Sequence, residues 1–185
     1  MSKGVLAVLS AFGVVALLVI GLVVGYIGFS NDANRFEIAI KAQYTDNRNT
    51  YDNGWKKVVE VAQVPEKYTA KLKELYDGTM KGRYGADGSQ AMMQWIQEQN
   101  PTIDPALYRQ LQQVIEEFRN KFQQSQTELI AKKQQYENFL YATTSGRFYN
   151  MIVGYPHIDM SKYDIVTSEK TEQDFETKKS DPLKI

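Results

Sequence analysis

Residues 4–29 of this chain have the sequence GVLAVLSAFGVVALLVIGLVVGYIGF. None of these 26 residues carries a charge. As an α-helix they would extend about 39 Å at ~1.5 Å per residue, whereas the hydrocarbon core of a bilayer is about 30 Å thick. The segment is therefore long enough to cross a membrane with some tilt. We predict a single-pass transmembrane anchor at residues 1–30, with the lipid bilayer as its partner.

A cleaved signal peptide is the alternative explanation for this segment. The apolar part of a signal peptide is about 7–15 residues long and is followed by a cleavage site of the small-x-small type. The apolar run here is longer, and the sequence YIGFSN at residues 26–31 offers no such site. We therefore favour an uncleaved anchor. Lys3 precedes the span and nearly balanced charges follow it, so the positive-inside bias favours a domain outside the cytoplasm.

Three glycines lie on one face near the end of the span. Gly21 and Gly25 form a G-x-x-x-G pair, and Gly28 continues the same face. Such pairs let two membrane helices approach closely, which makes these glycines packing candidates in a homo-oligomer. The simpler explanation is that glycine is common in membrane helices of every kind.

The composition narrows the classes of function. The chain has 22 basic and 22 acidic residues, so it lacks the basic excess with which proteins bind nucleic acid. It has no cysteine, which excludes disulfides, thiolate nucleophiles and cysteine-ligated metals. His157 is the only histidine, and the carboxylates are scattered singly along the predicted helices. We predict a protein that is not an enzyme, with no catalytic residue, metal or cofactor.

Beyond the span, apolar residues recur at helical spacing among polar helix formers. A first helix is predicted over residues 32–63, with an interruption allowed in its middle and Pro65 beyond its end. A second helix is predicted over residues 68–80, and a short third one between Ser89 and Asn100. These segments indicate an all-α domain.

A long helix is predicted from Pro105 to residue 142. The carboxylate of Asp104 can accept hydrogen bonds from the first N–H groups, and proline suits the first helical position. Four apolar residues in this helix repeat every 11 positions, which keeps the apolar stripe nearly parallel to the axis. They are Leu107, Phe118, Leu129 and Leu140.

A short helix is predicted to follow at residues 147–153, after a C-cap or kink at Ser145-Gly146. Gly154 and Pro156 would end it. Three of its residues are predicted to face the core. They are Phe148, Ile152 and Val153.

The predicted fold is all-α, with one N-terminal transmembrane helix and an elongated antiparallel helical bundle. The bundle is assigned to residues 31–160. Residues 161–185 are too polar to build a core and are predicted to form a mobile tail.

Two short motifs near the end of this bundle resemble those of the LemA family. One is Tyr136-Glu137-Asn138, and the other is the run RFYNMIVGYP at residues 147–156. Gln43-Tyr44 and Trp55 are similar to the early aromatic positions of that family. The resemblance implies a membrane-tethered helical bundle with no established catalytic residue and no cofactor. The motif residues that it singles out are Tyr136, Asn138, Tyr149, Asn150, Tyr155 and Pro156.

Three functional hypotheses follow from the sequence. The first is a scaffold or accessory factor that binds protein partners at a membrane surface. The second is a lysis or envelope-spanning factor of the holin or spanin type. The third is a sensor whose aromatic-lined bundle holds a small ligand.

Overall fold

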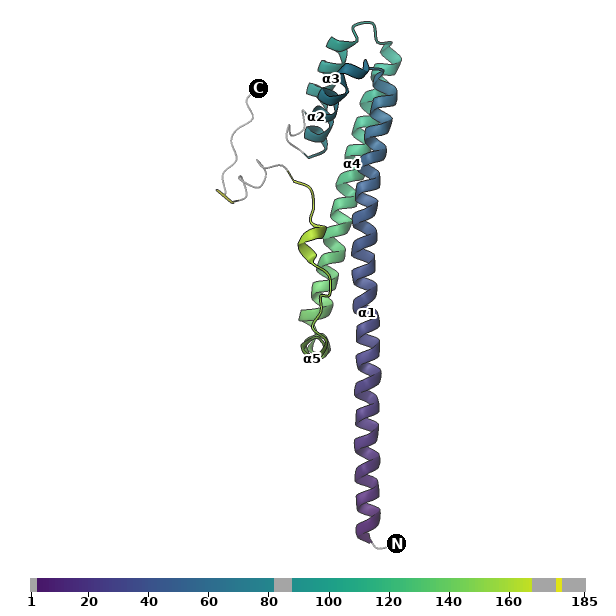
Figure 1. Cartoon of the computed structure of the whole chain (residues 1–185), viewed down its shortest axis with the longest axis vertical. Coiled ribbons are helices and arrows are strands. Elements are labelled where there is room, and N and C mark those ends of the chain that lie inside the picture. The colour runs from purple at the N-terminus through teal and green to yellow at the C-terminus, as the bar shows by residue number, and fades with distance from the viewer. Residues whose placement is uncertain (1–2, 82–87, 168–175, 178–185) are drawn as a thin grey trace. The chain divides into compact units, whose positions relative to one another are not determined.

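The computed structural model describes residues 3–81, 88–167 and 176–177, and every regular element in these ranges is helical. The prediction of an all-α chain is therefore confirmed for the described residues. Short 3₁₀ segments at Glu66–Tyr68 and Met160–Tyr163 and a π-helical turn at Asn138–Ala142 complete the structure. The α-helices (Figure 1) are α1 (Lys3–Ala62), α2 (Thr69–Met80), α3 (Gly88–Gln99), α4 (Pro105–Glu137) and α5 (Thr144–Val153).

Helix α1 is 60 residues long and continues from the apolar segment into the rest of the chain without a break. The interruption that the sequence allowed in its middle does not occur. Within the described residues, α1 is the one helix long and apolar enough to cross a membrane. Its most apolar window has a mean hydropathy of 2.9, and no residue of that window is buried inside the structure.

The chain forms two compact units, and α1 and α4 contribute to both. The first unit combines Met1–Lys41 with Ala131–Tyr163, and the second combines Ala42–Ile130 with Asp164–Ile185. In each unit the two long helices are antiparallel. In the first unit Phe29 stacks on Phe139 (ring centroids 4.9 Å apart), whereas Phe36, later on α1, stacks on the earlier Tyr136 (5.8 Å).

The second unit has the larger hydrophobic core. Helices α2 and α3 pack there with α1 and α4. The apolar spacing along residues 32–63 predicts that Val59 faces the core, but this is wrong: Val58 is buried and Val59 is exposed. The buried core residues are Val58, Val61, Ala62, Leu72, Leu75, Tyr76, Met80, Met92, Met93, Ile96, Leu111, Val114, Ile115 and Phe122.

The helix ends in the second unit lie where the sequence predicted them. Helix α1 stops at Ala62, and Gln63 then adopts a positive φ of 48° ahead of Pro65. At the start of α4 the Asp104 carboxylate accepts hydrogen bonds from the backbone N–H of Ala106 (2.6 Å) and Leu107 (3.4 Å). This N-cap satisfies two donors that have no partner within the helix.

The first unit departs from the sequence prediction around α5. Ser145 and Gly146 lie in the first turn of α5 and not at a C-cap, because Thr143 is extended and its hydroxyl accepts from Gly146 N (2.9 Å). Phe148 and Ile152 were predicted to face the core, but both are exposed. The buried positions of α5 are Gly146 and Asn150. Gly154 ends the helix in the left-handed region (φ 77°), as predicted.

The predicted polar tail lies largely outside the described residues. Its first part, up to Thr167, includes the end of the 3₁₀ segment Met160–Tyr163 and then an irregular stretch. Residues 168–175 and 178–185 are not described.

Candidate functional site

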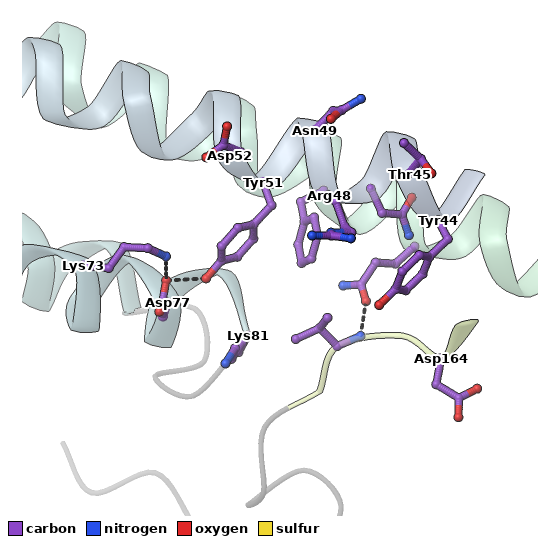
Figure 2. Close-up of a pocket in the computed structure, with 14 residues that line it drawn as sticks. Tyr44, Thr45, Arg48, Asn49, Tyr51, Asp52, Lys73, Asp77, Lys81 and Asp164 are labelled. Carbon is purple, nitrogen blue, oxygen red and sulfur yellow. Dashed lines mark hydrogen bonds and ion pairs between the residues drawn. The ribbon is translucent and has the colours of Figure 1, made fainter. Parts of the chain in front are cut away.

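The second unit contains a pocket with a volume of about 680 Å³. Tyr44, Arg48 and Asp52 of α1 face it at a spacing of four residues, which places them on one side of the helix. Lys73, Asp77 and Lys81, on α2 and just after it, repeat this spacing (Figure 2). The lining residues are Tyr44, Thr45, Asn47, Arg48, Asn49, Tyr51, Asp52, Lys73, Asp77, Lys81, Phe122, Gln126, Asp164 and Val166.

The charges in the pocket lining are mixed. Three lining residues are basic and three are acidic, so the pocket has no excess of either sign. A site of this kind complements a ligand surface that also carries both signs, because each unpaired charge would lose solvation on binding. The pocket therefore suits a polar protein segment or a zwitterionic molecule better than a polyanion.

Asp77 organises one wall of the pocket. Its carboxylate accepts short hydrogen bonds from the Tyr51 hydroxyl and the Lys73 ammonium, drawn as dashed lines in Figure 2. The Lys73 Nζ also lies 4.7 Å from the ring centroid of Tyr51, 5.3 Å from that of Trp55 and 5.5 Å from that of Tyr76. A cation that is held by both a carboxylate and several aromatic faces is well fixed.

The two tyrosines of this wall remain protonated. Burial raises the pKa of Tyr51 above its ordinary value, and the hydrogen bond to Asp77 raises it further. Burial also raises the pKa of Tyr76, and the nearby Asp77 charge adds to the effect. The Tyr76 hydroxyl donates to the carbonyl of Tyr51 (2.8 Å). Both side chains therefore act as hydrogen-bond donors and not as bases.

A polar layer joins α1 to α4 beside the pocket. Gln43 Nε2 donates to Ser125 Oγ (3.2 Å), and all three residues of the layer, Gln43, Asn47 and Ser125, are buried. With its amide nitrogen facing α4, Asn47 donates to the carbonyl of Ser125 (3.0 Å). At the pocket rim the Val166 N–H donates to Gln126 Oε1 (2.6 Å) and holds the irregular segment on α4.

The described lining offers hydrogen bonds and charges but no paired nucleophile and base. It contains no serine, cysteine or histidine, and its one hydroxyl besides tyrosine is that of Thr45. Across the described part of the chain, no three residues among His, Cys, Asp and Glu gather closely enough to hold a metal ion.

The first unit brings several motif residues together around a buried carboxylate. Glu37 is 5% exposed, and its Oε1 accepts from the Tyr136 hydroxyl (2.8 Å) and from the backbone N–H of His157 (2.7 Å). Burial raises the pKa of Tyr136, and the hydrogen bond to Glu37 raises it further. The sequence analysis missed Glu37. Its only signal was its place on the buried stripe of α1, between Ala33 and Ile40.

Asn150 and Tyr155 fix the loop after α5. The Asn150 Oδ1 accepts from Tyr155 N (2.7 Å), and its Nδ2 donates to the Tyr155 carbonyl (3.1 Å). The Tyr155 hydroxyl donates to Asn34 Oδ1 (3.1 Å) on α1. Asn138 and Pro156, by contrast, are exposed on the surface. The structure thus brings part of the motif set together within the first unit, where these residues hydrogen-bond to the loop after α5 and to α1.

The three predicted packing glycines have different surroundings. A Cβ atom added at Gly25 would meet the Tyr149 ring of the same chain, with Cζ at 2.6 Å. At Gly21 and Gly28 an added Cβ would have open space around it. Gly25 is therefore already in contact with α5 of the same chain. Gly21 and Gly28 stay candidates for contact with a helix of another copy.

Replacing Tyr136 with phenylalanine is expected to destabilise the first unit by about 1–3 kcal/mol, because the buried Glu37 carboxylate would lose a donor. The matched control is Tyr141→Phe. The Tyr141 side chain is half exposed, and the Tyr155 carbonyl to which its hydroxyl donates (3.3 Å) also accepts from Asn150, so the cost should stay within about 0.5 kcal/mol. Denaturant unfolding of the full-length protein in detergent micelles, followed by circular dichroism, measures both. Equal losses would contradict the importance assigned to the Glu37 contact.

The described part of the chain thus includes two groups of interacting polar residues, the pocket lining and the Glu37 cluster. The pocket lies within the second unit, and the Glu37 cluster lies within the first. No protein-family model, no curated protein and no solved structure matches this chain.

Proposed function

We propose that this protein is a non-enzymatic, single-pass membrane protein whose helical domain binds a protein partner at the membrane surface. One observation supports this proposal above the others. Helix α1 presents exposed apolar side chains from Val5 to Ile27 and then continues into the cores of both units. An exposed apolar surface of this length is unfavourable in water and favourable in lipid. The helical domain would then be tethered to a bilayer.

The pocket of the second unit is the proposed contact site for the partner. Its rim carries exposed charged residues, Arg48 and Asp52 on α1 and Lys81 just after α2. The contacts of Asp77 with Lys73 and Tyr51 hold one wall in place. A preorganised wall reduces the entropy lost on binding. The resemblance to the LemA family favours the same class of function, a tethered bundle without catalytic residues.

Proximity labelling from the intact anchored protein tests this proposal. We expect a reproducible set of labelled proteins that is lost when the pocket is altered by Arg48→Glu. The substitution would place a negative charge opposite the partner's acidic group that Arg48 attracts in the wild type. The matched control is Arg109→Glu, an equivalent charge reversal at an exposed position of α4 outside the pocket lining. The compartment of the labelled proteins also reports on which side of the membrane the domain lies.

Two outcomes would contradict the proposal. The wild type, Arg48→Glu and Arg109→Glu could label the same proteins, in which case the pocket is not the contact site. The wild type could also label no more than residues 1–41 fused to an unrelated soluble domain, in which case the helical domain binds no protein partner.

A ligand-sensing role is the second candidate, and the size of the pocket favours it. Its volume of about 680 Å³ lies within the range of small-molecule sites, about 300–1,000 Å³. Thermal unfolding of the full-length protein in detergent, screened against a set of zwitterionic metabolites, tests this role. A ligand that stabilises the wild type but not Arg48→Glu would support it, and uniform absence of stabilisation would count against it.

The lysis hypothesis makes a separate prediction. A holin-like or spanin-like factor would stop growth or lyse cells when expressed, whereas a tethered binding protein would do neither.

A further inference from the structure

Helix α5 exposes an apolar face. Phe148 is 44% exposed, Met151 80% and Ile152 59%, and their spacing of three and four residues places them on one side of the helix. The opposite side, with Gly146 and Asn150, is buried in the first unit. The apolar side of an amphipathic surface helix normally faces the protein core. In α5 it is the apolar side that is exposed at the surface.

This apolar face adjoins the apolar segment of α1. The Tyr149 ring stacks on Phe29 (5.8 Å between centroids) and lies against Gly25. An apolar groove of about 250 Å³ separates the two helices next to this contact. Its lining consists of Val19, Leu22, Val23, Tyr26, Phe148, Tyr149 and Ile152. The exposed surface of α5 is thus continuous with the surface that is proposed to face lipid.

The length of the apolar segment indicates how deep α5 lies. The segment exceeds the hydrocarbon thickness by about 9 Å, and Val19 lies about 15 Å before Phe29 along the axis. Even if the whole extra length of about 9 Å projected from the membrane at the Phe29 end, Val19 would still lie about 6 Å inside the hydrocarbon. The groove that Phe148 and Ile152 line therefore reaches the boundary between headgroups and acyl chains.

The direction of α5 agrees with this position. Figure 1 shows α5 nearly end-on, while α1 runs along the long axis of the picture. Helix α5 therefore lies across α1, and a bilayer that α1 crosses would have α5 in its plane. Amphipathic helices at membrane interfaces adopt this arrangement, with the apolar face about 5–10 Å deep.

We propose that α5 is an interfacial helix that inserts Phe148, Met151 and Ile152 among the lipids next to the span. This inference rests on the proposed function, because it requires α1 to cross a bilayer. The amphipathic rings of Tyr26 and Tyr149 suit the headgroup region. Helix α5 would then hold the first unit at a defined depth and orientation on the membrane, which a single flexible tether does not do.

A spin-label depth measurement tests the inference on the full-length protein. The chain contains no cysteine, so single labelling sites are available without removing any native residue. Met151→Cys carries the nitroxide on the face of α5, Val15→Cys at the middle of the span and Glu116→Cys on the exposed side of α4. The protein is reconstituted in vesicles of phosphatidylcholine and phosphatidylglycerol, and collision rates with oxygen and with a nickel chelate are measured at each site.

We expect the oxygen-to-nickel ratio at position 151 to be several-fold above that at position 116 and below that at position 15. A ratio at 151 equal to that at 116, with a lipid-like ratio at 15, would overturn the interfacial position of α5 and leave the anchor intact. Water-like ratios at both 151 and 15 would overturn the anchor itself. Protection of 151 from both reagents, with dipolar broadening, would show that a second copy covers the face and would also overturn the proposal.

Discussion

Val15→Lys combined with Leu18→Lys is expected to release the full-length protein from the membrane fraction into the aqueous fraction. Both residues lie near the middle of the apolar segment, and their side chains are exposed along α1. A lysine at the centre of a transmembrane helix costs about 2.5–3.5 kcal/mol. Two lysines therefore cost about 5–7 kcal/mol, which corresponds to a change of about 10⁴-fold to 10⁵-fold in partitioning.

Flotation of cell lysates through a density gradient, followed by immunoblotting, measures this release and separates membranes from aggregates. The matched control places two lysines on the same helix beyond the apolar segment, at Ile38 and Val59, which are both exposed. This control should float with the wild type. A double-lysine variant at Val15 and Leu18 that still floats would contradict the anchor, as would a mature product that begins after Phe29.

Ile115→Ala is expected to destabilise the second unit by about 2–5 kcal/mol. Ile115 is fully buried in the core that α1, α2, α3 and α4 form together. Truncation of its side chain would remove apolar contacts and leave a cavity that the four surrounding helices can fill only in part. The loss would be a large fraction of the stability of a domain of this size.

Ile130→Ala provides the matched control, because it removes the same atoms from the same helix at a position that is 38% exposed. Its cost should be about 1 kcal/mol or less, since water already reaches the side chain. Denaturant unfolding in detergent micelles, monitored by circular dichroism, measures the free energy of unfolding of both variants. An m-value equal to that of the wild type would show that the transition itself is unchanged. If the two alanine variants lose equal stability, Ile115 is not part of a packed core.

Local signals account for the parts of the fold that could be predicted. The hydropathy of the apolar segment, the proline after α1, Asp104 before α4 and Gly154 after α5 each act within a few residues of their position. A cap or a breaker therefore acts on its own helix end, whichever element that helix packs against. The 11-residue repeat was confirmed in part, because Leu129 and Leu140 are buried whereas Leu107 and Phe118 are partly buried.

Helix orientation could not be predicted in the same way. The sequence of α5 has apolar residues on one side, and the usual expectation turns that side inward. In the structure the inward side is the one with Asn150, because its amide forms two hydrogen bonds with the backbone of Tyr155. Turning Asn150 outward would leave the N–H and carbonyl of Tyr155 without this partner, and an unsatisfied buried polar group costs about 1–3 kcal/mol.

The two polar sites required the folded chain. Glu37 meets Tyr136, which is 99 residues away, and Asp77 meets Tyr51, which is 26 residues away. No pattern within a single helix specifies such a pair, because the chain contains 22 acidic residues and 12 tyrosines that could pair. The apolar span and the helix boundaries follow from interactions along the chain. The meeting of these side chains follows from packing between helices, which alone brings distant residues within hydrogen-bonding distance and excludes water from them.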